Sequence, residues 1–142
     1  MIRLRTRLTA IFAVTAVCAS SAAMAADVTI TVDGIQPGTG NILVALQTED
    51  DFLTSGGAYS VVVPAEADTM TTVLEGVEPG FYAVAVVHDE NGDGTFTLGD
   101  DAPSEAWGVS GSPISEPSFD NAKIEVSDGA ENAATVTISY PM

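Results

Sequence analysis

From Asp27 onward, apolar and polar residues alternate along much of the chain, and this pattern constrains the fold more than any other feature. A period of two residues places successive side chains on opposite faces of a β-strand, whereas the 3.6-residue period of an amphipathic helix is absent. Turn pairs such as Asp33-Gly34 separate the alternating stretches at nearly regular intervals. The stretches expected to form strands are residues 28–32, 42–46, 59–63, 69–74, 81–87, 122–126 and 134–140. This profile predicts an all-β fold, a single β-sandwich of about seven strands.

Two segments depart from simple alternation. Residues 81–87 are apolar at every position, which predicts a central strand that is packed on both faces. Residues 99–121 are rich in Gly, Pro, Ser and acidic residues, and segments of this length without secondary structure are uncommon in compact domains. Because Trp107 and Phe119 lie within this second segment, we expect it to form a packed loop.

The first 26 residues have the order of a signal peptide. Three arginines precede an apolar run at residues 8–19, and an Ala-x-Ala motif ends at Ala25. The pattern predicts cleavage near Ala25 or Ala26, export to the periplasm or the medium, and one mature domain at residues 27–142. The alternative is an uncleaved membrane anchor, but the apolar run is shorter than the ~20 residues that a membrane-spanning helix needs.

Removal of this segment would leave a strongly acidic domain without cysteine. Cys18, the only cysteine, lies within the apolar run, so the mature domain would contain no disulfide. Lys123 would be its only cationic side chain, against all twenty acidic residues. Such a charge repels phosphate backbones and anionic lipids, which excludes nucleic-acid binding and membrane-surface binding as functions. Cations are the expected partners, although the charge is also typical of a surface adapted for solubility or high salt.

Residues 89–100 match the spacing of a calcium-binding loop. Such loops need oxygen ligands at positions 1, 3 and 5, a glycine at position 6, a backbone carbonyl at position 7 and a carboxylate at position 12. The predicted metal ligands are Asp89, Asn91, Asp93, Thr95 and Asp100. Because the loop follows a strand, it would be an EF-hand-like loop in a β-protein, with a weak affinity for Ca²⁺ of ~10⁻⁴ to 10⁻³ M. The alternative is an acidic hairpin turn formed by the Asn-Gly and Asp-Gly pairs.

The chain shows little sign of catalytic machinery. His88 is its only histidine, and neither a cysteine nor a Gly-x-Ser-x-Gly motif accompanies it in the mature part. One histidine cannot form the usual zinc sites, and we expect His88 to end a strand and to bond to loop backbone. Trp107 offers a ring that would stack on a sugar, although aromatic residues of sandwiches more often belong to the core.

The stretch Glu78-Pro79-Gly80-Phe81-Tyr82 resembles the turn-into-strand motif of transthyretin-like and carboxypeptidase-regulatory-like sandwiches. In that motif Pro and Gly make the turn, and the tyrosine hydroxyl binds the backbone of the corner. Together with residues 88–94, 105–110 and 117–123, the chain resembles exported bacterial proteins of the domain of unknown function 2141 (DUF2141) family. Ala106 and Trp107 stand where the family pattern has Pro and Tyr.

This resemblance implies export and a β-sandwich, but no activity. It also implies one shared surface, formed by His88, Asp89, Asn91, Glu105, Trp107 and Ser110, with His88, Glu105, Trp107 and Ser110 as its ligand-binding candidates. We therefore predict a non-enzymatic exported module that is stabilised by Ca²⁺ through residues 89–100. The alternatives are a surface around Trp107 that binds a carbohydrate, a peptide or a cell-surface partner, and, less favoured, a hydrolase that uses His88.

Overall fold

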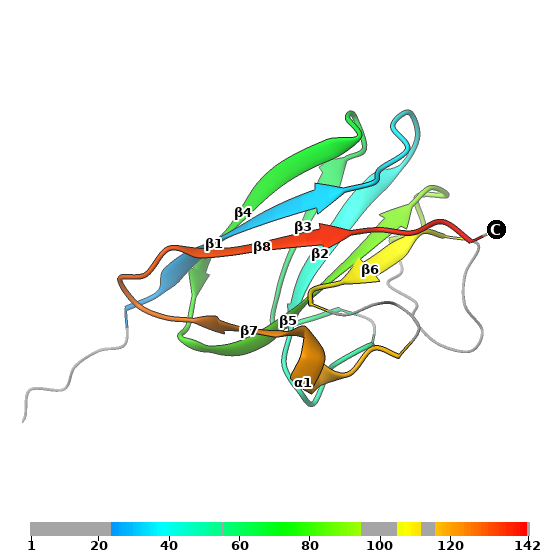
Figure 1. The fold of residues 1–142 in the computed structure, drawn as a ribbon. Helices are drawn as coiled ribbons and strands as arrows, with labels where there is room; N and C mark the ends of the chain where they lie inside the picture. Colours follow the sequence, from blue (N-terminus) through cyan, green and yellow to red (C-terminus); the bar gives the residue numbers. More distant parts are fainter. Residues whose placement is uncertain (1–23, 55, 95–104, 112–115, 142) are drawn as a thin grey trace, which may run out of the picture.

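The computed structural model describes residues 24–54, 56–94, 105–111 and 116–141. Within these residues there are eight strands and one short helix, and the strands form two sheets that pack face to face (Figure 1). One sheet has the strand order β4-β1-β8, and the other has the order β3-β2-β5-β6 with β7 also paired to β5. The elements are β1 (Ala26–Asp33), β2 (Asn41–Gln47), β3 (Tyr59–Pro64), β4 (Thr69–Val77), β5 (Gly80–Asp89), β6 (Trp107–Val109), α1 (Phe119–Ala122), β7 (Lys123–Val126) and β8 (Asn132–Thr137). The predicted all-β sandwich is thus confirmed. The predicted signal peptide lies outside the described residues except for its last three positions.

The alternation in the sequence places one row of each strand in the core between the sheets. On β1, Val28, Ile30 and Val32 are fully buried, whereas the threonines between them face outward. Burial of each such side chain stabilises the fold by about 1.5–3 kcal/mol. With no cysteine among the residues of the two sheets, this apolar core holds them together.

Strand β5 is covered on both faces, as its apolar sequence predicts. Every residue from Tyr82 to Asp89 is buried, and the outer face of the strand carries a second small cluster around Ala85 and Val87. The loop after β2 covers this cluster because the buried Gln47 amide bonds to the loop backbone at Leu53, Thr54 and Gly56. The prediction that every residue of 81–87 is covered is wrong for Phe81. This residue is 55% exposed, and its ring lies beside the Lys123 ammonium group.

One edge of β5 is shared by two short strands, because β6 pairs with residues 85–87 and β7 with residues 80–83. Ser110 fills the junction between them. Its Oγ accepts a hydrogen bond from the Val84 N–H (2.9 Å) and donates one to the Ala122 carbonyl (2.6 Å). Strand β6 also pairs with Ser139 through Trp107, which brings the end of the chain against this edge.

The start of β5 forms the predicted tyrosine corner. The Tyr82 hydroxyl donates to the Glu78 carbonyl at 2.9 Å, so the prediction that this hydroxyl binds the corner backbone is confirmed. Burial, followed by the neighbouring Tyr59, raises the pKa of Tyr82 from its ordinary value.

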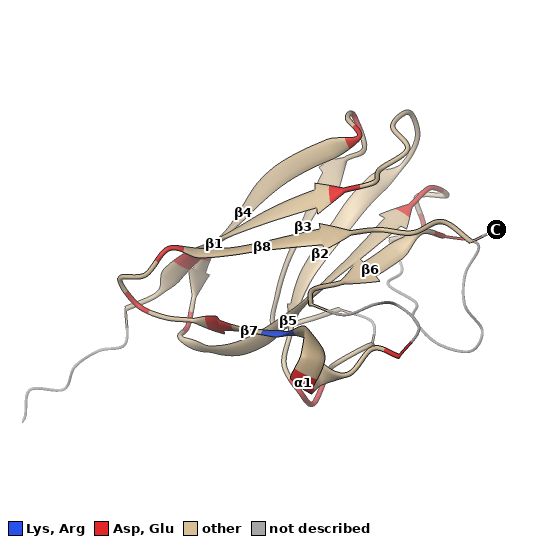
Figure 2. Cartoon of the chain, in the orientation of Figure 1, with Lys and Arg blue, Asp and Glu red and all other residues tan. Residues whose placement is uncertain are grey.

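Acidic residues lie mainly in turns and at strand ends, with Lys123 as the single cation of the described part (Figure 2). Lys123 forms an ion pair with Asp120 at 2.7 Å. Among the described residues, no helix has the length and apolar character needed to cross a membrane.

Candidate metal site

The register of β5 with β6 brings two acidic residues together. Val87 pairs with Trp107, and the His88 N–H donates to the Ala106 carbonyl at 2.8 Å, which continues the pairing beyond the end of β6. The next two residues, Asp89 and Glu105, therefore lie beside each other. Because side chains alternate along a strand, both lie on the outer face of the sheet, in line with Val87 and Trp107.

A tight turn follows Asp89, and the Asp89 carboxylate organises it. Its Oδ1 accepts hydrogen bonds from the N–H groups of Gly92 (2.8 Å) and Asp93 (3.1 Å), and its Oδ2 accepts one from Gly94 (2.8 Å). Asn91 Oδ1 accepts a further bond from the Asp93 N–H at 2.9 Å. Gly92 and Gly94 have φ angles of 73° and 70°, which glycine adopts without steric cost. These bonds account for the shape of the turn without any ion.

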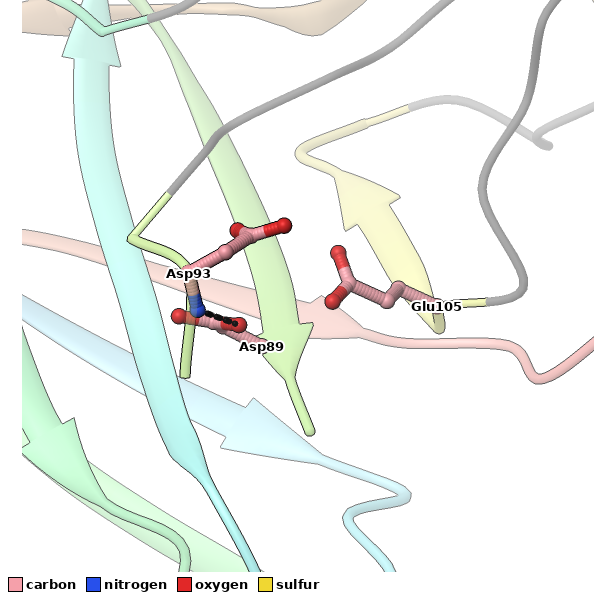
Figure 3. Close-up of side chains that lie close together, drawn as sticks. All are labelled: Asp89, Asp93 and Glu105. Atoms are coloured by element: carbon pink, nitrogen blue, oxygen red, sulfur yellow. Dashed lines mark hydrogen bonds between the residues drawn. The ribbon is translucent and has the colours of Figure 1, made fainter. Parts of the chain in front are cut away.

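The turn and the segment before β6 together form an acidic triad of Asp89, Asp93 and Glu105 (Figure 3). One carboxylate oxygen of each residue lies within 4.8 Å of the others. Asp89 and Glu105 are buried, whereas Asp93 is exposed. Figure 3 shows the Glu105 carboxyl group directed toward the two aspartates. This spacing is that of oxygen ligands around a single divalent cation.

Glu105 is the unusual member of the triad. It is 6% exposed, and its Oε1 has no hydrogen-bond partner among the described residues. Burial, and then the charges of Asp89 and Asp93, raise the pKa of the Glu105 carboxyl group from its ordinary value. A buried polar atom without a partner costs about 1–3 kcal/mol. A bound cation would remove that cost by accepting the free oxygen as a ligand.

The structure describes three of the five predicted metal ligands. Asp89, Asn91 and Asp93 lie together in the turn, whereas Thr95 and Asp100 lie outside the described residues. Glu105 was predicted as part of a ligand surface, and the structure brings it to the metal ligands instead. Its position, sixteen residues after Asp89 in the sequence, lies beyond any twelve-residue loop pattern. Only the pairing of β5 with β6 reveals the contact.

The other residues of the predicted ligand surface have partners inside the protein. His88 is fully buried, with Nε2 2.7 Å from the Thr39 carbonyl and Nδ1 2.6 Å from the Tyr140 hydroxyl. The prediction that His88 ends a strand and bonds to loop backbone is thereby confirmed. Ser110 is 2% exposed and closes the junction beside β5. Trp107 is half-buried and packs against the cluster on the outer face of β5.

The protein is thus a small all-β sandwich domain with an acidic triad at the end of its central strand. A family model described as "Uncharacterized protein conserved in bacteria (DUF2141)" matches residues 30–134, and the chain belongs to this family. The matched range includes the whole triad. No curated protein and no solved structure matches the chain.

Proposed function

We propose that this protein is an exported, non-enzymatic β-sandwich module that binds Ca²⁺ at Asp89, Asp93 and Glu105 and is stabilised by it. The observation that carries the proposal is the free, buried Oε1 of Glu105, which points at two further carboxylates. The turn bonds of Asp89 do not carry it, because they serve the backbone whether or not an ion is present.

The chemistry of the ligands favours calcium over other metals. All three side chains offer hard oxygen ligands, whereas structural zinc sites use Cys and His. Ca²⁺ accepts six to eight oxygens in flexible arrangements, which suits a triad on a turn and a neighbouring segment. Mg²⁺ demands a near-ideal octahedron at about 2.0–2.1 Å and keeps several waters. The many acidic residues around the sandwich raise the local concentration of cations.

A cation at this position would join two parts of the chain that the sheet alone connects weakly. Asp89 and Asp93 belong to the turn after β5, and Glu105 belongs to the segment before the three-residue strand β6. Binding to the folded state alone stabilises that state by mass action, by about 2.7 kcal/mol at a hundredfold excess of free ion over the dissociation constant.

A non-enzymatic role is supported by the environment of His88. Both ring nitrogens form hydrogen bonds inside the protein, so neither is offered to a substrate. Carbohydrate or peptide binding around Trp107 is the less favoured alternative, because the ring packs against an apolar cluster of the sheet.

The test is a thermal unfolding experiment on the purified protein in chelator, in millimolar Ca²⁺ and in the same concentration of Mg²⁺. We expect a rise in Tm that is larger in Ca²⁺ than in Mg²⁺ and that Asp93→Asn removes. Asp128→Asn is the matched control, because Asp128 is an exposed residue that also precedes a glycine with a positive φ angle. Equal effects of the two ions, or an unchanged response in Asp93→Asn, would refute calcium binding at the triad.

A further inference from the structure

The residue before Asp89 is fixed by three hydrogen bonds that reach three separate parts of the chain. The His88 N–H donates to the Ala106 carbonyl at 2.8 Å. Its Nε2 lies 2.7 Å from the Thr39 carbonyl, in the turn between β1 and β2, and its Nδ1 lies 2.6 Å from the Tyr140 hydroxyl. His88 therefore ties the end of β5 to the segment before β6, to the turn between β1 and β2, and to segment 138–140.

The direction of these bonds follows from their chemistry. The Thr39 carbonyl only accepts, so Nε2 carries the ring proton. In the neutral ring, Nδ1 then accepts a hydrogen bond from the Tyr140 hydroxyl. The Tyr140 oxygen in turn accepts one from the Gln36 N–H at 2.8 Å. Each of these groups is satisfied, and the rings of His88 and Tyr140 pack edge to face at 5.8 Å.

The same contacts support the two buried members of the triad. The bond to Ala106 fixes the residue next to Glu105. The turn that Nε2 holds includes Gly40, which lies so close to the Asp89 carbonyl that a Cβ atom there would overlap with it. Segment 138–140, which carries Tyr140, also exchanges two backbone bonds with Trp107 through Ser139, at 3.2 and 3.0 Å.

We propose that Tyr140 is a positioning residue for the cation site, and that cation binding is coupled to the docking of segment 138–140. The proposal rests on the proposed function, since it needs an ion at the triad. Tyr140 acts through His88, which holds the backbone of Asp89 and, through Ala106, that of Glu105. Coupling between two sites is reciprocal, so an ion at the triad must also stabilise the docked segment.

The test measures Ca²⁺ binding by isothermal titration calorimetry, for the wild-type protein, Tyr140→Phe and Tyr82→Phe. Tyr82→Phe is the matched control because it also removes one hydroxyl that forms a hydrogen bond within the protein, to the Glu78 carbonyl at the opposite end of β5. A hydrogen bond that contributes about 0.5–1.5 kcal/mol corresponds to a roughly two- to twelvefold change in affinity. We expect Tyr140→Phe to weaken Ca²⁺ binding by this factor and Tyr82→Phe to leave the affinity unchanged, although both variants lose stability.

A second measurement needs no variant. In the wild-type protein, Ca²⁺ is expected to slow hydrogen exchange of the Ser139 amide, which bonds to Trp107, far along the chain from the triad. Calcium binding with equal affinity in all three proteins, together with calcium-independent exchange at Ser139, would overturn the coupling and leave the proposed function standing. Absence of any Ca²⁺ binding to the wild-type protein would refute both.

Discussion

Replacing Glu105 by glutamine is expected to change stability in opposite directions with and without calcium. Without an ion at neutral pH, the wild-type protein buries a carboxylate that has one unpaired oxygen and lies beside two further acids. Glutamine keeps the shape, removes the charge and adds an amide N–H₂ that can donate to Asp89 or Asp93. Relief of one unsatisfied buried group is worth about 1–3 kcal/mol. We expect Glu105→Gln to raise the free energy of unfolding in chelator by about 1 kcal/mol, or Tm by about 4 °C.

In calcium the sign reverses. The wild-type protein gains about 2.7 kcal/mol at a hundredfold excess of the ion, and the variant loses most of this gain along with a charged ligand. The wild-type protein should then unfold at the higher temperature. The assay is thermal unfolding of both proteins in chelator and in millimolar Ca²⁺. Glu125→Gln, the same change at an exposed residue of β7, serves as the control. Its stability relative to wild type should not change sign between chelator and Ca²⁺.

The result in chelator should also depend on pH. Since burial and the neighbouring aspartates raise the pKa of folded Glu105, the protonated carboxyl group is favoured by folding. Its contribution to stability is fully present below the pKa of an unfolded glutamate and is lost as the pH rises through the folded value. The advantage of Glu105→Gln should therefore be largest at neutral pH and shrink as the solution is acidified. A variant that is less stable than wild type under all conditions would refute the reasoning, because Glu105 would then make a favourable contact.

Two further predictions concern side-chain hydrogen bonds of Ser110 and Tyr82, which support strand β5. Ser110→Ala leaves the Val84 N–H and the Ala122 carbonyl without their partner, so we expect a loss of about 1–3 kcal/mol in urea unfolding; a loss no larger than that of the exposed Ser60→Ala would contradict this role. The raised pKa of Tyr82 means that its neutral hydroxyl stabilises the fold below pH 10 and that this contribution is lost as the pH rises through the folded value. The stability difference between wild type and Tyr82→Phe should accordingly shrink in denaturation measurements above pH 10, and a constant difference would argue against it.

The strands were predictable from the sequence where one face is buried and the other is solvated. β1 shows the period of two residues directly, and β5 shows the apolar run expected of a strand that is covered twice. β6 has three residues, too few for any period to appear, and α1 consists of a single turn. The short elements depend on tertiary contacts, such as the Ser110 bridge, and these leave no local signature in the sequence.

The candidate site was predictable only in part, for a related reason. Asp89, Asn91 and Asp93 lie close in the sequence, so spacing alone suggested a metal loop. Glu105 joins them through the register of two strands, and that register is set by hydrogen bonds between distant residues. The family resemblance implies a shared surface that includes His88 and Ser110, whereas both side chains are buried and bond to partners inside the protein.

Asp89 and Glu105 differ in the hydrogen bonds that their side chains make, and this difference decides which variant can test for calcium binding. The Asp89 carboxylate accepts three backbone hydrogen bonds, so removing it would disturb the turn in any ionic condition. A loss of calcium binding in an Asp89 variant would therefore not separate a lost ligand from a lost turn. Glu105 Oε1 makes no hydrogen bond in the described part of the chain, and burial beside Asp89 and Asp93 raises the pKa of its carboxyl group. Because the turn bonds do not depend on Glu105, the response of a Glu105 variant to calcium reports on the ion more directly.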